Sequence, residues 1–152
     1  MNIKKILPHI IAVVAFIVVS LVFFSPVMEG KKLFQSDMAQ FDGASKELHD
    51  YEKASGEGAN WANAMFSGMP SYQIAFPQSN NIFNTIAPPL TLWNRSFDAG
   101  IFFIMMLGFY VFMCSMGAKP LISAFSALIY ALGSYNVIII TVGHITKAWA
   151  MA

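Results

Sequence analysis

Charge is scarce in this sequence. Only 11% of its 152 residues are charged, against about 25% in soluble domains. The net charge is +1 and no basic cluster occurs, so the chain lacks the positive surface that attracts nucleic acid. Hydrophobic residues make up 57% and gather in long uncharged runs. Because such runs are typical of membrane spans, the composition predicts an integral membrane protein.

Cysteine and the common enzyme motifs are scarce as well. Cys114 is the only cysteine, so no disulfide can form within the chain. It lies inside an apolar run, where packing is its expected role. The sequence contains no phosphate-binding glycine loop, no paired-histidine zinc motif and no C-x-x-C pair, which removes the chemistries that these motifs identify.

Three apolar stretches are long enough to cross a bilayer, which takes about 20 residues of helix. They are residues 6–24, 99–116 and 121–142. Only the breaker residues 117–120 (GAKP) separate the last two, and we expect a helical hairpin there. The sequence therefore predicts an all-α integral membrane protein with three transmembrane helices. Residues 143–152 then form an external segment or the start of a further helix.

The first apolar stretch predicts an uncleaved anchor. Lys4 and Lys5 precede it, as in a signal peptide, but the apolar run is longer than a signal-peptide core. No small-residue cleavage site follows it. We therefore assign residues 1–25 to a cytoplasmic N-terminus and the first span.

The lysines also predict the orientation. The two N-terminal lysines and Lys119 in the turn lie in short segments, and lysine in short loops marks the cytoplasmic side. Residues 26–98 then form a large extracytoplasmic loop. Lys31 and Lys32 argue mildly against this orientation, but long loops cross the membrane regardless of charge.

Within the loop, residues 36–54 show the pattern of an amphipathic helix. The apolar positions recur at three- and four-residue steps: Met38, Phe41, Ala44, Leu48 and Tyr51. The glycines of residues 55–58 end it. A helix of this kind beside a membrane often lies along the bilayer surface, and we expect that here. Further on, Trp93 is expected at the headgroup level before the second span.

Asp37 follows the first span closely and allows two interpretations. As the N-cap of the amphipathic helix, with Gln40 at the third helical position, it would stabilise the helix by about 1 kcal/mol. As a functional carboxylate, it would act as a general base or hold a divalent cation. The two roles are compatible, because a capping residue occupies a fixed position.

A polar stripe follows the third span. If that helix continues to the end of the chain, five residues fall within an arc of roughly 100°: Gly133, Asn136, Gly143, His144 and Lys147. Such a stripe faces protein or a water-filled cavity rather than lipid. Either Lys147 reaches the headgroups and His144 bonds a backbone carbonyl, or the two bind an anion such as a lipid phosphate. The spacing of Asp37, His49 and His144 along the sequence matches no recognised pattern of metal ligands.

Three blocks of the sequence resemble the N-terminal part of the YfhO family of bacterial membrane proteins: SPVMEGKKLFQSDMAQFDG, WANAMFSGMPSYQ and VGHITKAWAMA. Family members are far longer and resemble membrane glycosyltransferases of the GT-C fold. The resemblance implies an enzyme of the bacterial cytoplasmic membrane that moves a sugar from a polyprenyl-phosphate donor to an envelope glycan or lipid. It implies that Asp37 is the catalytic acid, with Asp42 a weaker candidate, and it favours His144 and Lys147 as ligands of the donor phosphate.

Two other functions fit the same features. A transporter or flippase for lipid-linked sugars would bind the phosphate without consuming a donor, and a non-catalytic membrane subunit would dock a partner through its loop. The sequence ends inside an apolar helix pattern, and three spans are few for enclosing a lipid carrier. We therefore expect an N-terminal fragment of a larger polytopic protein, inactive alone.

Overall fold

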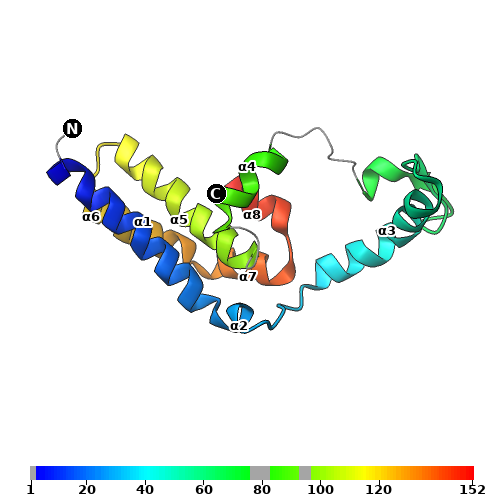
Figure 1. The fold of residues 1–152 in the computed structure, drawn as a ribbon, viewed down its shortest axis with the longest axis horizontal. Coiled ribbons are helices and arrows are strands. Elements are labelled where there is room, and N and C mark those ends of the chain that lie inside the picture. The colour runs from blue at the N-terminus through cyan, green and yellow to red at the C-terminus, as the bar shows by residue number, and fades with distance from the viewer. Residues whose placement is uncertain (1–2, 76–82, 93–96) are drawn as a thin grey trace.

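The structure, a computed structural model, describes residues 3–75, 83–92 and 97–152 (Figure 1). It is mostly helical. The elements are α1 (Ile3–Phe23), α2 (Ser25–Met28), α3 (Ser36–Ser55), β1 (Trp61–Ala62), β2 (Met69–Pro70), a 3₁₀ helix (Ser71–Gln73), α4 (Phe83–Leu90), α5 (Phe97–Ser115), α6 (Pro120–Ala131), α7 (Ser134–Val142) and α8 (Ile145–Met151). β1 and β2 form a short antiparallel pair. Trp93 lies outside the described residues.

Two of these helices, α1 and α5, are each long and apolar enough to cross a membrane. α6 and α7 reach that length only together, and they are bent by 49° at the break between them. The chain is thus a helical protein with two or three candidate spans. The third span expected over residues 121–142 is divided into α6 and α7, because Gly133 takes the non-helical angles φ −54° and ψ 133° between them.

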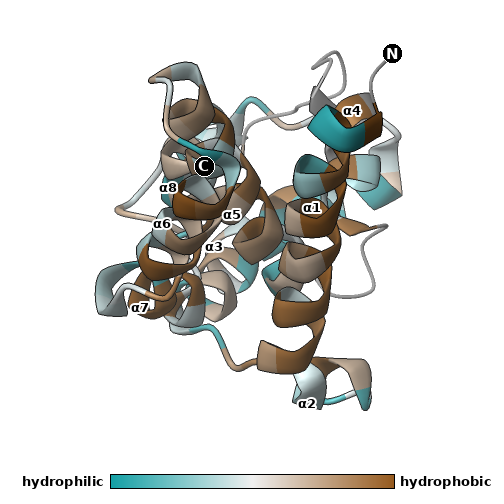
Figure 2. Cartoon of the chain, turned by 90° about the vertical axis from the view of Figure 1, so that its left-hand side faces the viewer, coloured by the Kyte–Doolittle hydropathy of each residue, from teal (hydrophilic) through white to brown (hydrophobic). Residues whose placement is uncertain are grey.

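The outward faces of the spans are apolar, as a lipid environment requires. Only 17% of the most apolar stretch of α1 is buried against other parts of the structure. Figure 2 shows α1 in the brown of hydrophobic residues along most of its length. Its exposed side chains include Leu7, Ile10, Ile11, Val14 and Val18. Monomeric soluble proteins rarely expose an apolar surface of this extent. The exposed face of α1 therefore supports membrane insertion.

Aromatic contacts hold the spans together. Phe16 of α1 meets Tyr110 of α5 edge-on, with 5.6 Å between ring centroids. On another side of α5, Phe109 stacks on Tyr130 of α6 at 4.4 Å. Such pairs contribute about 0.5–1.5 kcal/mol each beyond the area they bury. The α5–α6 turn is a Schellman motif around Gly117, whose φ of +85° suits glycine. The helical hairpin predicted at this turn therefore forms.

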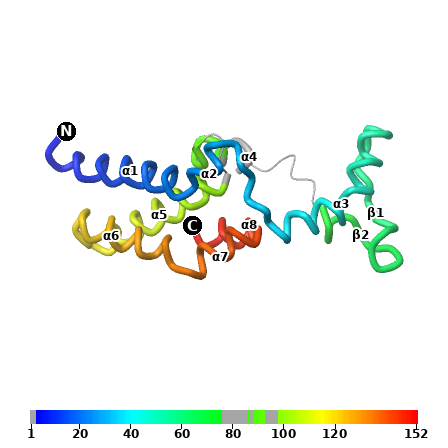
Figure 3. The backbone as a smooth tube through the Cα atoms, turned by 90° about the horizontal axis from the view of Figure 1, so that it is seen from below, coloured from blue at the N-terminus to red at the C-terminus, as the bar shows by residue number. Residues whose placement is uncertain are grey.

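α3 leaves the bundle at the end where α1 stops, and it carries the β1–β2 pair away from the spans (Figures 1 and 3). It covers Ser36–Ser55, and Gly56, with φ +75°, caps its C-terminus. Glu47 ties the β1–β2 pair to α3, because its carboxylate accepts hydrogen bonds from the backbone of Asn63 and Ala64. Whether α3 lies along a bilayer surface stays a prediction.

Two local predictions around the site are wrong. The N-cap of α3 is Gln35 rather than Asp37, and no side chain caps this end. The third span also does not continue through residues 143–152, because Gly143, at φ +98°, ends α7 before α8 begins. Only a glycine adopts that angle without strain. The polar residues of the predicted stripe therefore do not share one helix face.

Candidate functional site

Asp37 and His144 are brought together where α3 meets the α7–α8 junction. Oδ2 of Asp37 lies 2.9 Å from Nδ1 of His144. A carboxylate only accepts hydrogen bonds, so a hydrogen bond between the two side chains requires the hydrogen on Nδ1, which leaves Nε2 of a neutral ring as an acceptor. The two side chains are 35% and 53% exposed, respectively. The pair is therefore an Asp–His dyad that an external molecule can reach.

The turn after α7 fixes the backbone of His144. Its N–H donates to the carbonyl of Ile139 at 2.9 Å, and the N–H of Gly143 donates to the carbonyl of Ile140 at 3.1 Å. These two bonds are those of a Schellman motif, in which a glycine reverses the chain at the end of a helix. His144 then begins α8 as its N-cap residue. The backbone position of His144 is thus set by two helices.

Lys147 has a different environment. Its Nζ lies 5.0 Å from the centroid of the Tyr135 ring, a cation–π geometry. No hydrogen bond or ion pair among the described residues joins Lys147 to Asp37 or His144. In this structure Lys147 therefore contacts Tyr135 rather than the dyad, and a phosphate site shared by His144 and Lys147 stays a prediction.

The remaining sequence candidates do not join the dyad. Asp42 is exposed on α3, and no hydrogen bond or ion pair to its carboxylate occurs among the described residues. Asn136 is buried, donates to the carbonyl of Tyr130 at 2.6 Å, and leaves its Oδ1 without a partner. Within the described ranges no three His, Cys, Asp or Glu side chains are grouped as metal ligands.

Two further polar residues lie beside the dyad and were missed by sequence analysis. Nε2 of Gln35 donates to Oδ1 of Asp98 at 2.9 Å and to the carbonyl of Ile140 at 2.8 Å. Two signals could have identified them. Gln35 is two residues from Asp37, and Asp98 is an acid directly before an apolar span, a position where ionisable residues are rare and usually paired.

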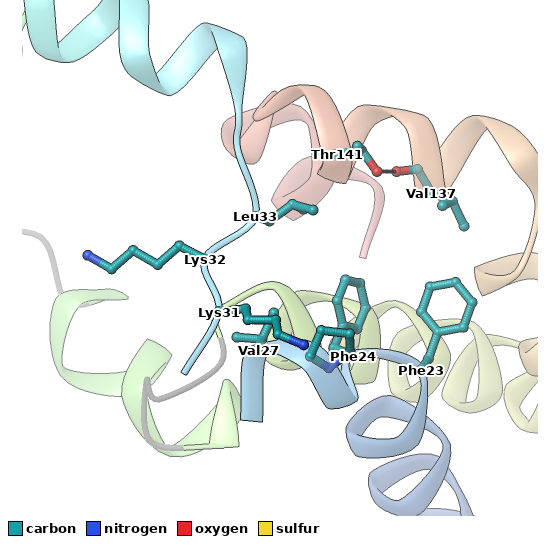
Figure 4. A pocket seen from close by; sticks show the side chains of 9 residues that line it. Phe23, Phe24, Val27, Lys31, Lys32, Leu33, Val137 and Thr141 are labelled. Carbon is teal, nitrogen blue, oxygen red and sulfur yellow. Dashed lines mark hydrogen bonds between the residues drawn. The ribbon is translucent and has the colours of Figure 1, made fainter. Parts of the chain in front are cut away.

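A groove opens at the same end of the bundle. A cavity of about 230 Å³ has an apolar wall formed by Phe23, Phe24, Pro26, Val27, Leu33 and Val137, completed by Lys31, Lys32 and Thr141 (Figure 4). A second hollow of about 380 Å³ shares four of these residues and extends to Gln35 and Asp98. The two therefore adjoin, with an apolar part near α1 and a polar part at Gln35 and Asp98.

The lysines at this groove are accessible. Lys31 pairs with Glu29 at 2.9 Å, but both side chains are well exposed, and such pairs are worth about 0–1 kcal/mol. Figure 4 shows Lys32 extending away from the two phenylalanines. The hydroxyl of Thr141 is already bonded to the carbonyl of Val137. Positive charge at the rim is thus available to an anion, while the wall is apolar.

Comparison with models of known protein families, with characterised proteins and with solved structures yields no match. The candidate site therefore rests on the geometry of the chain's own residues.

Proposed function

We propose that this chain carries the extracytoplasmic acid–base site of a membrane glycosyltransferase that uses a polyprenyl-phosphate sugar donor. The observation that carries the proposal is the Asp37–His144 pair, 2.9 Å apart and open to solvent. The resemblance of three sequence blocks to the YfhO family supports it. The acceptor is a hydroxyl of an envelope glycan or lipid, and the membrane is the bacterial cytoplasmic membrane with the N-terminus inside.

The dyad suits proton removal from the acceptor. As the acceptor oxygen bonds to the anomeric carbon, the bond from that carbon to the phosphate oxygen breaks, and the phosphate leaves with the electron pair. The hydroxyl proton passes to Nε2 of His144, while Asp37 holds Nδ1–H and stabilises the imidazolium. In this proposal His144 is the proton acceptor, which replaces the phosphate-binding role expected from the sequence.

The groove suits the donor. A polyprenyl phosphate has a long apolar tail and an anionic head, and the groove combines an apolar wall with lysines at its rim. Lys31 and Lys32 offer point charges that favour the negative charge on the departing phosphate. The proposal therefore assigns the phosphate to these lysines instead of His144 and Lys147.

The test is sugar transfer in isolated membranes that contain the protein expressed from its complete gene. Asp37→Asn should reduce the rate by about 10²- to 10⁴-fold, the usual contribution of a positioned acid–base group. Asp42→Asn is the matched control, because it makes the same chemical change on the same helix away from the dyad. The amount of each variant in the membrane is measured by immunoblot. Full activity of the Asp37 variant would contradict the proposal.

One observation also favours a second function. The groove could hold a lipid-linked sugar for movement across the bilayer, because binding there requires no bond to be made. A flippase would move labelled lipid-linked sugar without releasing polyprenyl phosphate, and Asp37→Asn would leave that movement unchanged. A donor-turnover assay on the same membranes therefore separates the two functions.

A further inference from the structure

Gln35 connects three helices through one amide group. It is the N-cap residue of α3, and its Nε2 donates to Oδ1 of Asp98 in α5 at 2.9 Å and to the carbonyl of Ile140 in α7 at 2.8 Å. Both hydrogens of the amide are therefore used. A bond from an amide to a carboxylate is charge-assisted, and such bonds are stronger than neutral ones.

The carbonyl that Gln35 holds belongs to the turn that presents His144. Ile140 also accepts the hydrogen bond from the N–H of Gly143, and the neighbouring Ile139 accepts from the N–H of His144. The amide of Gln35 thus attaches the start of α3 to the same turn that sets the position of the histidine.

Close packing reinforces this attachment. A Cβ atom on Gly143 would lie 3.0 Å from Cβ of Gln35 and 3.1 Å from Cγ of Met38. The first turn of α3 therefore lies directly against the glycine beside His144. Farther along, α3 buries Ser45 and Leu48 and holds the β1–β2 pair through Glu47. The position of Asp37 depends on the contacts at this first turn.

We propose that Gln35 and Asp98 are positioning residues that hold Asp37 against His144. The inference rests on the proposed acid–base dyad and adds the pair that sets its geometry. Asp98 anchors the amide from the start of α5, and Ile140 anchors it from the end of α7. Loss of the amide releases the first turn of α3, so the carboxylate of Asp37 no longer selects the Nδ1-protonated ring of His144.

The substitution Gln35→Glu tests this with little change in size. It replaces the donating NH₂ by an oxygen, so that a carboxylate faces the carboxylate of Asp98 and the carbonyl of Ile140. Gln40→Glu is the matched control, because Gln40 is exposed on the next turn of the same helix. Asp98→Asn is the conservative variant, because the asparagine still offers an oxygen to accept from Gln35.

The measurement is the ¹⁵N spectrum of histidine-labelled protein in lipid nanodiscs, which reports the tautomer of each ring. The His144 signal is identified by its loss in His144→Gln. Gln35→Glu should lower the ratio of Nδ1–H to Nε2–H tautomer at His144 on the order of tenfold, because one hydrogen bond to a charged group is worth at least that factor. Gln40→Glu should leave the ratio near its original value, and Asp98→Asn, which turns the charge-assisted bond into a neutral one, should lower it less than Gln35→Glu does.

The ¹⁵N signals of His9 and His49 serve as the folding control, because they should be unchanged in every folded variant. If Gln35→Glu does not fold, Gln35→Ala takes its place. An unchanged tautomer ratio in the folded Gln35 variant would overturn the positioning role. Asp37→Asn separates this from failure of the dyad itself. If it shifts the ratio while the Gln35 variant does not, the dyad stands and only the positioning role fails. If neither shifts the ratio, both are wrong.

Discussion

Nδ1 of His144 lies 2.9 Å from Oδ2 of Asp37. This contact joins α3, which leaves the bundle, to the start of α8. Asp37 belongs to the first turn of α3, and His144 begins α8. The turn after α7 holds the backbone of His144. The meeting of the two side chains depends on the close approach of α3 to the turn at Gly143, and the first prediction concerns that approach.

Gly143→Ala should destabilise the junction more than the same change at Gly117. Both glycines have positive φ angles, +98° and +85°, so each variant bears the roughly 1–2 kcal/mol that an L-residue loses in this region. Only at Gly143 would the new Cβ also press on Gln35, because Gly117 has open space around it. Thermal unfolding of both variants in the same detergent measures the difference. Equal destabilisation would show that the α3 contact contributes nothing.

The β1–β2 pair should detach from α3 in acid. Hydrogen bonds from the Ala64 backbone, then from Asn63, lower the pKa of Glu47. A group with a lowered pKa in the folded state stabilises it above its unfolded pKa, about 4.3 for glutamate. That contribution disappears as the pH falls through the lower, folded value. We therefore expect the attachment to hold at neutral pH and to weaken below about pH 4.

Trp61 in β1 provides the signal for this prediction. Its fluorescence is followed against pH in a chain whose other two tryptophans are replaced by phenylalanine. Glu47→Gln is the control, because it removes the titrating group, and its curve should lack the acid transition. An identical transition in both proteins would mean that another group controls the attachment.

Val14→Asp should prevent stable membrane integration. Val14 is exposed on the outward face of α1, and an aspartate at the centre of a span costs about 2.5–3.5 kcal/mol on insertion. Tyr51→Asp, at an exposed position of α3, is the control and should leave the protein in the membrane. Extraction at alkaline pH distinguishes integrated from released protein. If both variants stay in the pellet, α1 does not face lipid at Val14.

Replacing Lys31 and Lys32 together by glutamine should weaken binding of polyprenyl phosphate. Each lysine near a lipid phosphate contributes about 1 kcal/mol, so the double variant should bind roughly 30-fold more weakly. Binding is measured in uncharged nanodiscs that contain either polyprenyl phosphate or the uncharged polyprenol. The original protein and the double variant should differ in their affinity for nanodiscs with polyprenyl phosphate, but not for nanodiscs with polyprenol. Lys53→Gln, on the far part of α3, is the control, and this variant should bind polyprenyl phosphate as tightly as the original protein does. If it loses as much affinity as the double variant, the site is not local to Lys31 and Lys32.

Much of the architecture was readable from the sequence, because it depends on local composition. Long apolar runs predicted the spans, and Gly117 with Pro120 predicted the hairpin between α5 and α6. The spacing of apolar residues predicted a helix over residues 36–54, and α3 occupies Ser36–Ser55. Each of these follows from hydrophobic periodicity or from a residue that cannot continue a helix.

The composition of the site was only partly readable. Asp37 and His144 were both singled out, but in separate roles, since nothing in their spacing indicates that they meet. The stripe that included His144 and Lys147 assumed one continuous helix, and the positive φ of Gly143 breaks that helix before both residues. Gln35 was not singled out, because its bridge to Asp98 and Ile140 cannot be seen along the chain.

By itself, then, the sequence determined a helical membrane protein with an acid close behind its first span. The tertiary structure alone decided that this acid pairs with His144 rather than capping its own helix. The physical reason is that hydrophobic periodicity is a local property, whereas the direction in which a chain leaves a glycine break is set by packing. At Gly143 the missing side chain lets Gln35 and Met38 approach, and that approach places the carboxylate beside the imidazole.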